Sequence, residues 1–414
     1  MSKKYYFFDY AATTPIDSQV FSAMKPYFKK HFGNPGGLHS VSRKARQAVN
    51  KATKNISKIL NCSPSEFIYT ASATEADNLA IIGVARSFGK GKIIISSIEH
   101  KAVLKACEAL EKEGFKIVKL PVHKNGLVDL NALKKELDKN TILVSITSAD
   151  SETGTIQPIK QIAKIIKNYQ NRRAPSVSEG ALLLPYFHTD ASQTAKYLDL
   201  NVKKLGVDLM TLSSHKTYGP KGIGGLYIKR EIRISPIIYG GGQEKGFRSG
   251  TENVPAIVGF AKALELAFKN RKKEYVYLKK LRDKLEKNIK KNIKKISVNG
   301  HPTLCLPNFL NISILGIEGE AMLLHLDKLG IMASTGSACN SESLEPSYIL
   351  TALGKSYKYI HGSLRFTLGK YNNESDINYV LEHLPKVVEK LRNMSPIDLN
   401  SKYQISNKFQ NSND

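Results

Sequence analysis

The sequence predicts an α/β protein built from two domains. Short apolar runs at 66–70, 92–97 and 141–146 have the length and composition of buried strands. Longer segments between them, roughly 101–113 and 129–138, are expected to form helices. At 414 residues the chain exceeds one ordinary hydrophobic core, so a second domain is expected.

The composition is that of a globular protein from a reducing compartment. Apolar residues make up 41% of the chain and charged residues 24%. No stretch approaches the roughly 20 apolar residues that cross a bilayer, and residues 1–9 lack the features of a signal peptide. The four cysteines have no metal-type spacing, which argues against a zinc site and a disulfide framework. We therefore expect a cytoplasmic protein with no membrane contact.

The formal net charge of +26 needs an interpretation. Lysines are spread over the predicted helices, as at 269–273 and 287–291, rather than gathered in one block. The sequence patterns of RNA-binding modules are missing. We interpret the charge as solvated helix faces and do not expect direct binding to nucleic acid. An acidic partner protein is the alternative.

The most informative stretch is 213–222, which contains Lys216. It lies between two apolar runs, 208–212 and 223–228, so Lys216 is expected at a turn between two buried strands. Burial of an unpaired ammonium group is costly. It lowers the pKa of a lysine and leaves a neutral amine that can attack a carbonyl carbon. A lysine on a surface turn is the alternative that the stretch alone leaves open.

The residues of this stretch, Ser-Ser-His-Lys-Thr-Tyr-Gly-Pro-Lys-Gly, resemble the segment of the class V aminotransferase superfamily whose lysine binds pyridoxal 5'-phosphate (PLP). More narrowly, they are similar to the cysteine desulfurases of the NifS/IscS type. The resemblance implies a PLP-dependent transferase of fold type I. Its large domain would hold a mixed, mostly parallel seven-stranded sheet sandwiched by helices, and a smaller α+β domain would follow. Lys216 would form a Schiff base with PLP, and Ser213 and His215 would also contact the cofactor.

The same resemblance divides the chain into four parts. Helical spacing from 255 to about 293 is interpreted as the long connection between the two domains. The expected parts are an N-terminal arm that packs with the small domain (1–15), the large PLP-binding domain (16–260), the small domain with a cysteine loop at about 333–347 (261–396), and a flexible tail (397–414).

The first motifs along the chain concern the mouth of the site and a phosphate group. Residues 7–15 are similar to a family segment that lines the active-site mouth, and 32–40 to a loop whose asparagine, here Asn34, approaches the substrate carboxylate. At 66–76 a strand is followed by small residues that open a helix, which leaves backbone N–H groups for an anion. The family motif places Ala73 and Thr74 on the PLP phosphate, whereas spacing alone also permits an ordinary capped helix.

Two polar residues follow predicted strands, at the edge where open α/β sheets bind ligands. His100 follows the strand at 92–97, and the resemblance implies that it stacks over the pyridine ring and moves protons. Asp190 ends a strand near 186–190, and the resemblance implies that it holds the pyridinium proton while Gln193 bonds the phenolic oxygen. From the residues alone, a structural histidine and a helix-capping aspartate stay open.

One motif departs from the family pattern. Family members carry Asn-Asn-Glu after the strand at 141–146, and the second asparagine bonds the phenolic oxygen of the cofactor. Here Ser151 takes that position and Asp150 precedes it. A serine hydroxyl can donate the same bond over a shorter reach, so we expect altered cofactor binding rather than lost activity. Residues 171–185 are interpreted as a loop insertion, because proline and polar residues interrupt any regular element.

The glycine-rich loop at 239–251 ends in Arg-Ser-Gly-Thr. This ending is similar to a family segment whose threonine reaches the phosphate bound by the neighbouring subunit. The resemblance therefore implies that Thr251 completes the site of a partner and that the protein is a homodimer.

A second specific motif contains Cys339. Residues 334–347 include Gly-Ser-Ala-Cys-Asn-Ser-Glu-Ser-Leu-Glu-Pro-Ser, which is similar to the long nucleophile loop of group I desulfurases. A cysteine among small polar residues keeps a usable thiolate. By contrast, Cys62 and Cys107 have apolar neighbours and are expected to be inert, and Cys305 is ambiguous.

An arginine completes the set of motifs. Arg365 lies in Ser-Leu-Arg-Phe-Thr-Leu-Gly, which matches the family strand whose arginine binds the substrate carboxylate. An ordinary surface ion pair is the alternative.

The motifs are colinear over 7–396 and together imply a PLP-dependent cysteine desulfurase. The expected reaction removes sulfur from L-cysteine, gives L-alanine and leaves a persulfide on Cys339. An iron–sulfur scaffold protein and tRNA-thiolation proteins are the expected sulfur acceptors. The alternatives are a selenocysteine lyase or a small-molecule aminotransferase, which would keep Lys216, Asp190 and Arg365, and a structural partner without activity.

Overall fold

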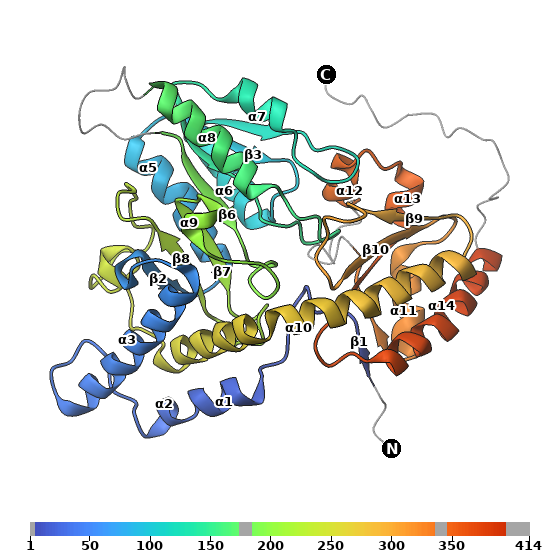
Figure 1. Cartoon of the computed structure of the whole chain (residues 1–414), viewed down its shortest axis with the longest axis horizontal. Coiled ribbons are helices and arrows are strands. Elements are labelled where there is room, and N and C mark those ends of the chain that lie inside the picture. The colour runs from blue at the N-terminus through green and yellow to red at the C-terminus, as the bar shows by residue number, and fades with distance from the viewer. Residues whose placement is uncertain (1–4, 174–183, 336–345, 395–414) are drawn as a thin grey trace.

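A mixed seven-stranded sheet forms the centre of the larger part of the molecule (Figure 1). The computed structural model describes residues 5–173, 184–335 and 346–394, so Cys339 lies outside the described residues. In spatial order the strands are β2 (Phe67–Thr70), β8 (Gly224–Ile228), β7 (Leu209–Ser213), β6 (Tyr186–Asp190), β5 (Thr141–Ser145), β3 (Lys92–Ser96) and β4 (Lys116–Leu120). The strands from β4 to β7 run parallel, whereas β8 is antiparallel to both of its neighbours. The predicted mixed, mostly parallel sheet is confirmed.

Helices cover both faces of this sheet because its strands present apolar side chains on both sides. In β2, Phe67 and Tyr69 belong to one hydrophobic core and Ile68 to another. The first core includes residues of α3 (Ser40–Leu60), α7 (Leu130–Glu136), α8 (Ile159–Arg173), α9 (Val202–Leu205) and α10 (Val254–Asn292). The second includes residues of α4 (Ala73–Asn78), the π-helical turn η2 (Leu79–Gly83), α5 (Val84–Phe88) and α6 (Lys101–Lys112). Two short helices, α1 (Ser18–Met24) and α2 (Pro26–Lys29), lie against α10.

A three-stranded antiparallel sheet forms the smaller part of the molecule. Its strands lie in the order β12 (Ser363–Thr367), β10 (Phe309–Ile314) and β9 (Ile296–Asn299). The helices of this part are α11 (Gly319–Lys328), α12 (Tyr348–Ala352), α13 (Tyr357–His361) and α14 (Glu374–Met394). The N-terminal strand β1 (Tyr6–Phe7) pairs in parallel with β11 (Ile331–Met332), so the start of the chain is joined to this part. Two 3₁₀ turns, η1 (Pro64–Glu66) and η4 (Glu244–Gly246), belong to the larger part.

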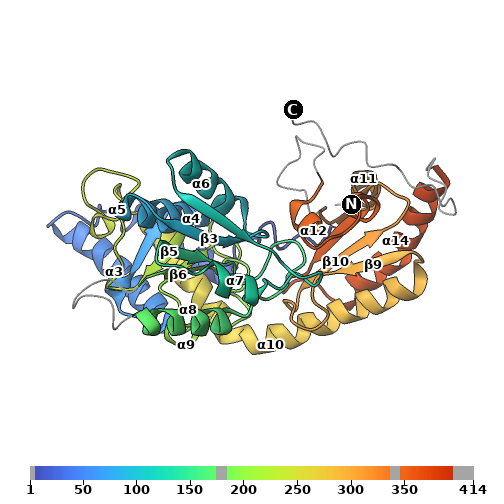
Figure 2. The same cartoon turned by 90° about the horizontal axis from the view of Figure 1, so that it is seen from above.

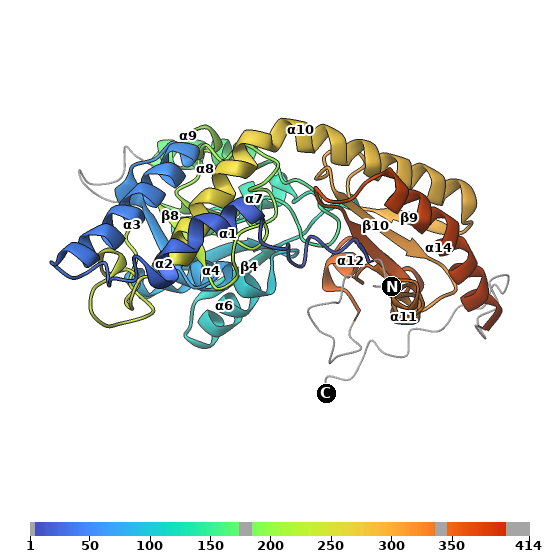
Figure 3. The ribbon, with the colours of Figure 1, turned by 90° about the horizontal axis from the view of Figure 1, so that it is seen from below.

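One helix, α10, contributes to the cores of both parts. With 39 residues it is about 58 Å long at 1.5 Å per residue, and Figures 2 and 3 show it running along both parts. Phe260 and Leu264 pack under the large sheet, and Leu281 and Leu285 pack against the small one. The predicted helical connection at 255–293 agrees with α10, whereas the residue bounds of the two domains stay a prediction. No helix in the described ranges is long and apolar enough to cross a membrane.

The structure corrects one interpretation of the sequence. Residues 171–173 were expected in a loop, but they form the last turn of α8. Arginine has good helix propensity and is favoured at the C-terminal end of a helix by the helix dipole, and Arg172 and Arg173 occupy that end. Residues 174–183 of the expected insertion lie outside the described residues.

Candidate active site

Lys216 lies in the turn that follows β7, and its amine points into the protein. Lys216 Nζ donates a short hydrogen bond to the carbonyl of Ala11 and a second one, of 2.8 Å, to the carbonyl of Ala12. The turn is closed by hydrogen bonds from Thr217 and Gly219 N–H groups to the Ser214 carbonyl, at 2.9 and 3.1 Å. Lys216 is half-buried. This arrangement disfavours the surface-turn alternative, because the amine is bonded to the N-terminal arm.

Asp190 and Gln193 lie at the same edge of the sheet. The parallel strands bring the C-terminal end of β6 next to that of β7, so Asp190 lies near the Lys216 turn. Asp190 is buried, and its Oδ1 accepts a hydrogen bond from Ser192 N–H at 2.8 Å. Gln193 Nε2 donates to the Ala11 carbonyl at 3.2 Å, the same oxygen that accepts from Lys216. The structure thus brings Lys216 and Gln193 to one acceptor.

His100 caps the N-terminus of α6 and is half-buried. Its Nδ1 accepts a hydrogen bond from Ala102 N–H at 3.1 Å. A neutral imidazole that accepts at Nδ1 carries its proton on Nε2. In a neutral His100 ring this hydrogen bond therefore leaves the proton on Nε2.

The N-terminus of α4 forms the candidate phosphate cup. Ser72 caps this helix, and its Oγ accepts from Glu75 N–H at 3.1 Å. Ala73 and Thr74 are the first two helical residues, so their N–H groups have no acceptor inside the helix. The cup lies tightly against the start of β8, because a Cβ on Gly224 would be 2.7 Å from the Ala73 nitrogen.

Ser213 and His215 belong to the same segment as Lys216. Ser213 Oγ is buried and has no hydrogen-bond partner within the described residues. His215 Nδ1 lies 3.1 Å from Thr13 Oγ1. Burial, together with the charges of Lys216 and Lys221, lowers the pKa of His215 to about 4, so its ring is neutral at pH 7.

These features together fit a phosphorylated pyridine cofactor. A buried hydroxyl without a partner costs stability unless a ligand pairs with it, and Ser213 Oγ is such a group. Helix N–H groups suit a phosphate. A buried carboxylate at Asp190 suits a protonated ring nitrogen.

Arg365 lies on β12 of the smaller part and reaches toward the larger part. Its Nη1 donates to the Ser151 carbonyl at 2.7 Å, and its Nη2 pairs with Asp9 Oδ1 at 2.8 Å. The Nε atom is buried without a partner in the described part of the chain. Ser151 therefore contacts Arg365 through its backbone. The preceding Asp150 fixes this turn by accepting from Thr153 N–H at 2.6 Å.

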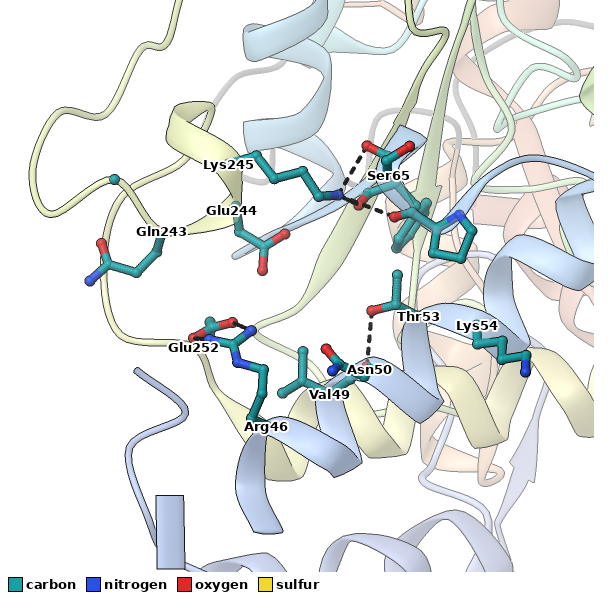
Figure 4. Close-up of a pocket in the computed structure, with 13 residues that line it drawn as sticks. Arg46, Val49, Asn50, Thr53, Lys54, Ser65, Gln243, Glu244, Lys245 and Glu252 are labelled. Carbon is teal, nitrogen blue, oxygen red and sulfur yellow. Dashed lines mark hydrogen bonds and ion pairs between the residues drawn. The ribbon is translucent and has the colours of Figure 1, made fainter. Parts of the chain in front are cut away.

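Asn34 and Thr251 lie on two loops that are linked by Arg46. Both are exposed, and Asn34 Oδ1 accepts from Gly36 N–H at 2.9 Å. Arg46 joins their loops: its Nε donates to the Pro35 carbonyl at 3.2 Å, and its Nη1 and Nη2 bind Glu252 at 2.7 and 2.8 Å. Figure 4 shows Arg46 and Glu252 facing each other in the wall of a cavity of about 540 Å³ between α3 and the segment 242–252. Hydrogen bonds of Arg46 thus link the loops that carry these two predicted residues.

The sequence did not single out a cluster of buried titratable groups beside Asp190. Burial raises the pKa of Glu99 to about 8 and raises that of Asp77, and in both cases the charge of Asp190 adds to the shift. Burial lowers the pKa of His188 to about 4, and its Nε2 lies 3.7 Å from Asp77 Oδ1. The pattern His-Thr-Asp at 188–190 could have predicted that His188 lies on the same face of the sheet as Asp190, because residues i and i+2 of a strand share a face.

The described cysteines lack the properties of a nucleophile. Burial raises the pKa of Cys62 to about 11 and those of Cys107 and Cys305 to about 12. Their thiols therefore stay protonated at neutral pH. The predicted nucleophile, Cys339, lies outside the described residues.

The chain matches the class-V aminotransferase family over residues 6–380 and belongs to that family. Cysteine desulfurase IscS of Dictyoglomus turgidum is 47% identical over 396 residues, 95% of this chain and 97% of that protein. Cysteine desulfurase IscS 1 of Archaeoglobus fulgidus is 46% identical over 393 residues, 94% and 99% of the two chains. Within the family, the chain therefore belongs with the cysteine desulfurases, as the sequence motifs predicted.

Solved structures agree with this placement. A NifS-like protein superposes with a TM-score of 0.86 at 35% identity, over 94% of this chain and 100% of the other. SspA in complex with cysteine superposes with a TM-score of 0.75 at 34% identity, over 89% of this chain and 99% of the other. The predicted fold is confirmed by both.

Proposed function

We infer that this chain is a cysteine desulfurase that uses PLP to take sulfur from L-cysteine. The observation that carries the proposal is the meeting of Lys216 Nζ and Gln193 Nε2 at the Ala11 carbonyl, beside the buried Asp190. The sequence motifs predicted that these three residues belong to one site, and the family membership supports the proposal.

The residues present are suited to hold PLP. Ser213 Oγ, the neutral ring of His215 and the first N–H groups of α4 would bind the phosphate, with Ala73 and Thr74 supplying the last of these. Asp190 would hold the ring nitrogen, and Gln193 and Ser151 would lie toward the phenolic oxygen. When bound, PLP would withdraw electron density from the α-carbon of the substrate.

Each remaining step belongs to a residue of the chain itself. Arg365 would bind the substrate carboxylate, with Asn34 as a second candidate, because a guanidinium group recognises a carboxylate in two-point fashion. Lys216 would move the α-proton at Nζ, and His100 would exchange a proton with the substrate at Nε2. The sulfur of Cys339 would form a bond to the substrate sulfur while the carbon–sulfur bond breaks. Cysteine and one thiol would thus become alanine and one persulfide.

The proposed partners are a second copy of the chain and proteins that accept sulfur. Thr251 would reach the phosphate in the site of the second copy, which agrees with its exposed side chain. An iron–sulfur scaffold protein and tRNA-thiolation proteins would take up the persulfide sulfur. The cytoplasmic location stays a prediction.

The experiment that tests the cofactor lysine compares two neighbouring lysines. Lys216→Ala should remove the visible absorbance of the purified protein and lower turnover of L-cysteine by about 1,000-fold or more, because the substitution removes the amine that would bind the cofactor and move the α-proton. Lys221→Ala, an exposed residue of the same segment, should keep both properties. Normal turnover in Lys216→Ala would contradict the proposal.

The nucleophile is tested with a pair of cysteine variants. Cys339→Ser should keep the absorbance and make no protein-bound persulfide, whereas Cys62→Ser should make as much persulfide as the natural chain, because the Cys62 thiol stays protonated. Full desulfuration of L-cysteine by Cys339→Ser would show that another thiol acts. Faster turnover of selenocysteine, or of an amino acid with a keto acid, would favour the alternative activities.

A further inference from the structure

Tyr218, two residues after Lys216, has a backbone conformation that is unfavourable for residues other than glycine. Its φ is 62°, in the left-handed region that favours glycine, and the side chain is buried. Such a conformation persists only where surrounding contacts hold it. We therefore expect the contacts of the Tyr218 ring to stabilise this backbone conformation.

Two lysines from different parts of the fold hold the ring. Lys196 Nζ, in the turn after β6, lies 4.0 Å from the ring centroid, and Lys370 Nζ, in the turn after β12, lies 4.4 Å from it. Both distances are within the range of cation–π attraction. The Tyr218 hydroxyl also accepts a hydrogen bond from the backbone N–H of Lys370 at 2.8 Å. The ring thus contacts the larger and the smaller part of the molecule at once.

Each ammonium group is paired with a carboxylate on a further segment. Lys196 Nζ lies 2.9 Å from Glu274 on α10, and Lys370 Nζ is paired with Asp17, which caps α1. Burial lowers the pKa of Lys196 to about 8 while the charge of Glu274 opposes the shift, so Lys196 remains a cation at pH 7. These residues line a cavity of about 140 Å³ beside the ring. We name Tyr218, Lys196, Lys370, Asp17 and Glu274 the Tyr218 cluster.

The backbone of Tyr218 is bonded to the arm that receives the Lys216 amine. Tyr218 N–H donates to Thr14 Oγ1 at 2.8 Å, and the Tyr218 carbonyl accepts from Asp17 N–H at 3.0 Å. Thr14 in turn donates its N–H and its hydroxyl to the His215 carbonyl, at 3.0 and 2.8 Å. The arm is therefore attached to the lysine turn on both sides of Lys216. A displacement of Tyr218 would move the carbonyl groups that accept from Nζ.

We propose that Lys196 and Lys370 act through the Tyr218 ring as positioning residues for Lys216. The proposal rests on the proposed role of Lys216 and deepens it, because it assigns a task to residues outside the predicted cofactor and substrate sites. The Tyr218 cluster holds the lysine turn, the arm and the smaller part in one arrangement. Loss of either cation–π contact loosens the turn while the substrate site at Arg365 stays in place.

The test reads the position of Lys216 in the protein without cofactor. An amine-selective reagent labels lysines, and mass spectrometry gives the labelling rate of Lys216 relative to Lys221 in the same sample. Lys196→Met and Tyr218→Leu should raise this ratio several-fold, because Nζ spends less time bonded to the arm. Lys203→Met, which removes an exposed lysine on α9, should leave the ratio unchanged.

A second measurement separates positioning from stability. In the cofactor-loaded enzyme, Lys196→Met should lower kcat for L-cysteine by about tenfold and change KM by less than about twofold, because a misplaced amine slows proton transfer but not carboxylate binding. An unchanged labelling ratio in Lys196→Met overturns the proposal, whether or not the melting temperature falls. The labelling test needs no desulfurase activity, so its failure is distinguishable from a failure of the proposed function.

Discussion

Glu99 is the immediate chain neighbour of His100, yet its side chain is completely buried. Its Oε1 accepts hydrogen bonds from Ser96 Oγ and from Thr147 N–H, and its Oε2 has no partner within the described residues. Burial raises its pKa from 4.5 to about 8, with the charge of Asp190 adding to the shift. The Glu99 side chain is therefore a neutral acid at pH 7. It adds no second negative charge beside Asp190.

Glu99→Gln should change how stability depends on pH. The folded pKa lies above the unfolded value, so the folded protein binds more protons than the unfolded one between about pH 4.5 and pH 8. The free energy of unfolding of the natural chain should therefore lose a few kcal/mol as the pH rises through this window. The variant, which resembles the protonated acid, should lose less. Thermal denaturation from pH 5 to pH 8 measures this, and parallel curves would contradict it.

At the residue scale, the sequence predicted which side chains come together only for residues that lie in family motifs. Lys216, Asp190 and Gln193 lie in such motifs, and the structure places them at one edge of the sheet. The ion pair between Arg365 and Asp9 joins residues 356 positions apart. No local pattern encodes a contact over that distance, so the sequence could not predict it.

At the scale of elements, the candidate phosphate cup depends on how closely α4 approaches β8. Gly224 is the first residue of β8, and a Cβ at this position would lie 2.6 Å from the Ser72 carbonyl carbon and 2.7 Å from the Ala73 nitrogen. Real Cβ atoms do not approach backbone so closely, so the glycine permits this packing.

Gly224→Ala should displace the start of α4 and weaken cofactor binding by about tenfold or more, since helix N–H groups bind a phosphate only in the correct position. PLP should be affected more than pyridoxal, which lacks the phosphate. Gly36→Ala serves as the control, because a Cβ there would meet only Asn34 Oδ1, at 3.4 Å. Titration of the protein without cofactor, followed by absorbance, gives both affinities. An equal loss for the two ligands would argue against the cup.

The elements themselves were predictable to different degrees. The strands β2, β3 and β5 agree with the predicted runs to within one residue at each end, because strands buried on both faces are continuous apolar runs. Neither α3 nor α14 was predicted from the sequence. The buried residues of α3 do recur at helical spacing, as at Ala45, Val49, Ala52 and Ile56, so this helix could have been predicted from its sequence pattern.

At the scale of the whole molecule, Thr251 lies on an exposed loop that Arg46 joins to the loop of Asn34. An exposed side chain is accessible to a second copy of the chain, as the proposed role of Thr251 requires. The proposed homodimer therefore predicts that two chains share the residues of one site.

Mixing two defective variants should restore activity. Lys216→Ala and Thr251→Ala chains, each impaired alone, should form mixed dimers in which one site holds both intact residues. After subunit exchange at equal amounts, about a quarter of all sites should be intact, and the turnover of L-cysteine should rise accordingly. Activity that stays at the average of the two separate variants would mean that Thr251 serves its own chain.

The pairing of the first strand has a consequence for the order in which the protein matures. The arm that accepts the Lys216 amine pairs with β11, and the Ala11 N–H donates to Thr367 Oγ1 at 2.9 Å. The arm is thus synthesised well before the segments on which it packs, which contain Ile331, Met332 and Thr367. A nascent chain that contains Lys216 but ends before residue 331 therefore lacks the partners that fix the arm to which this amine is bonded.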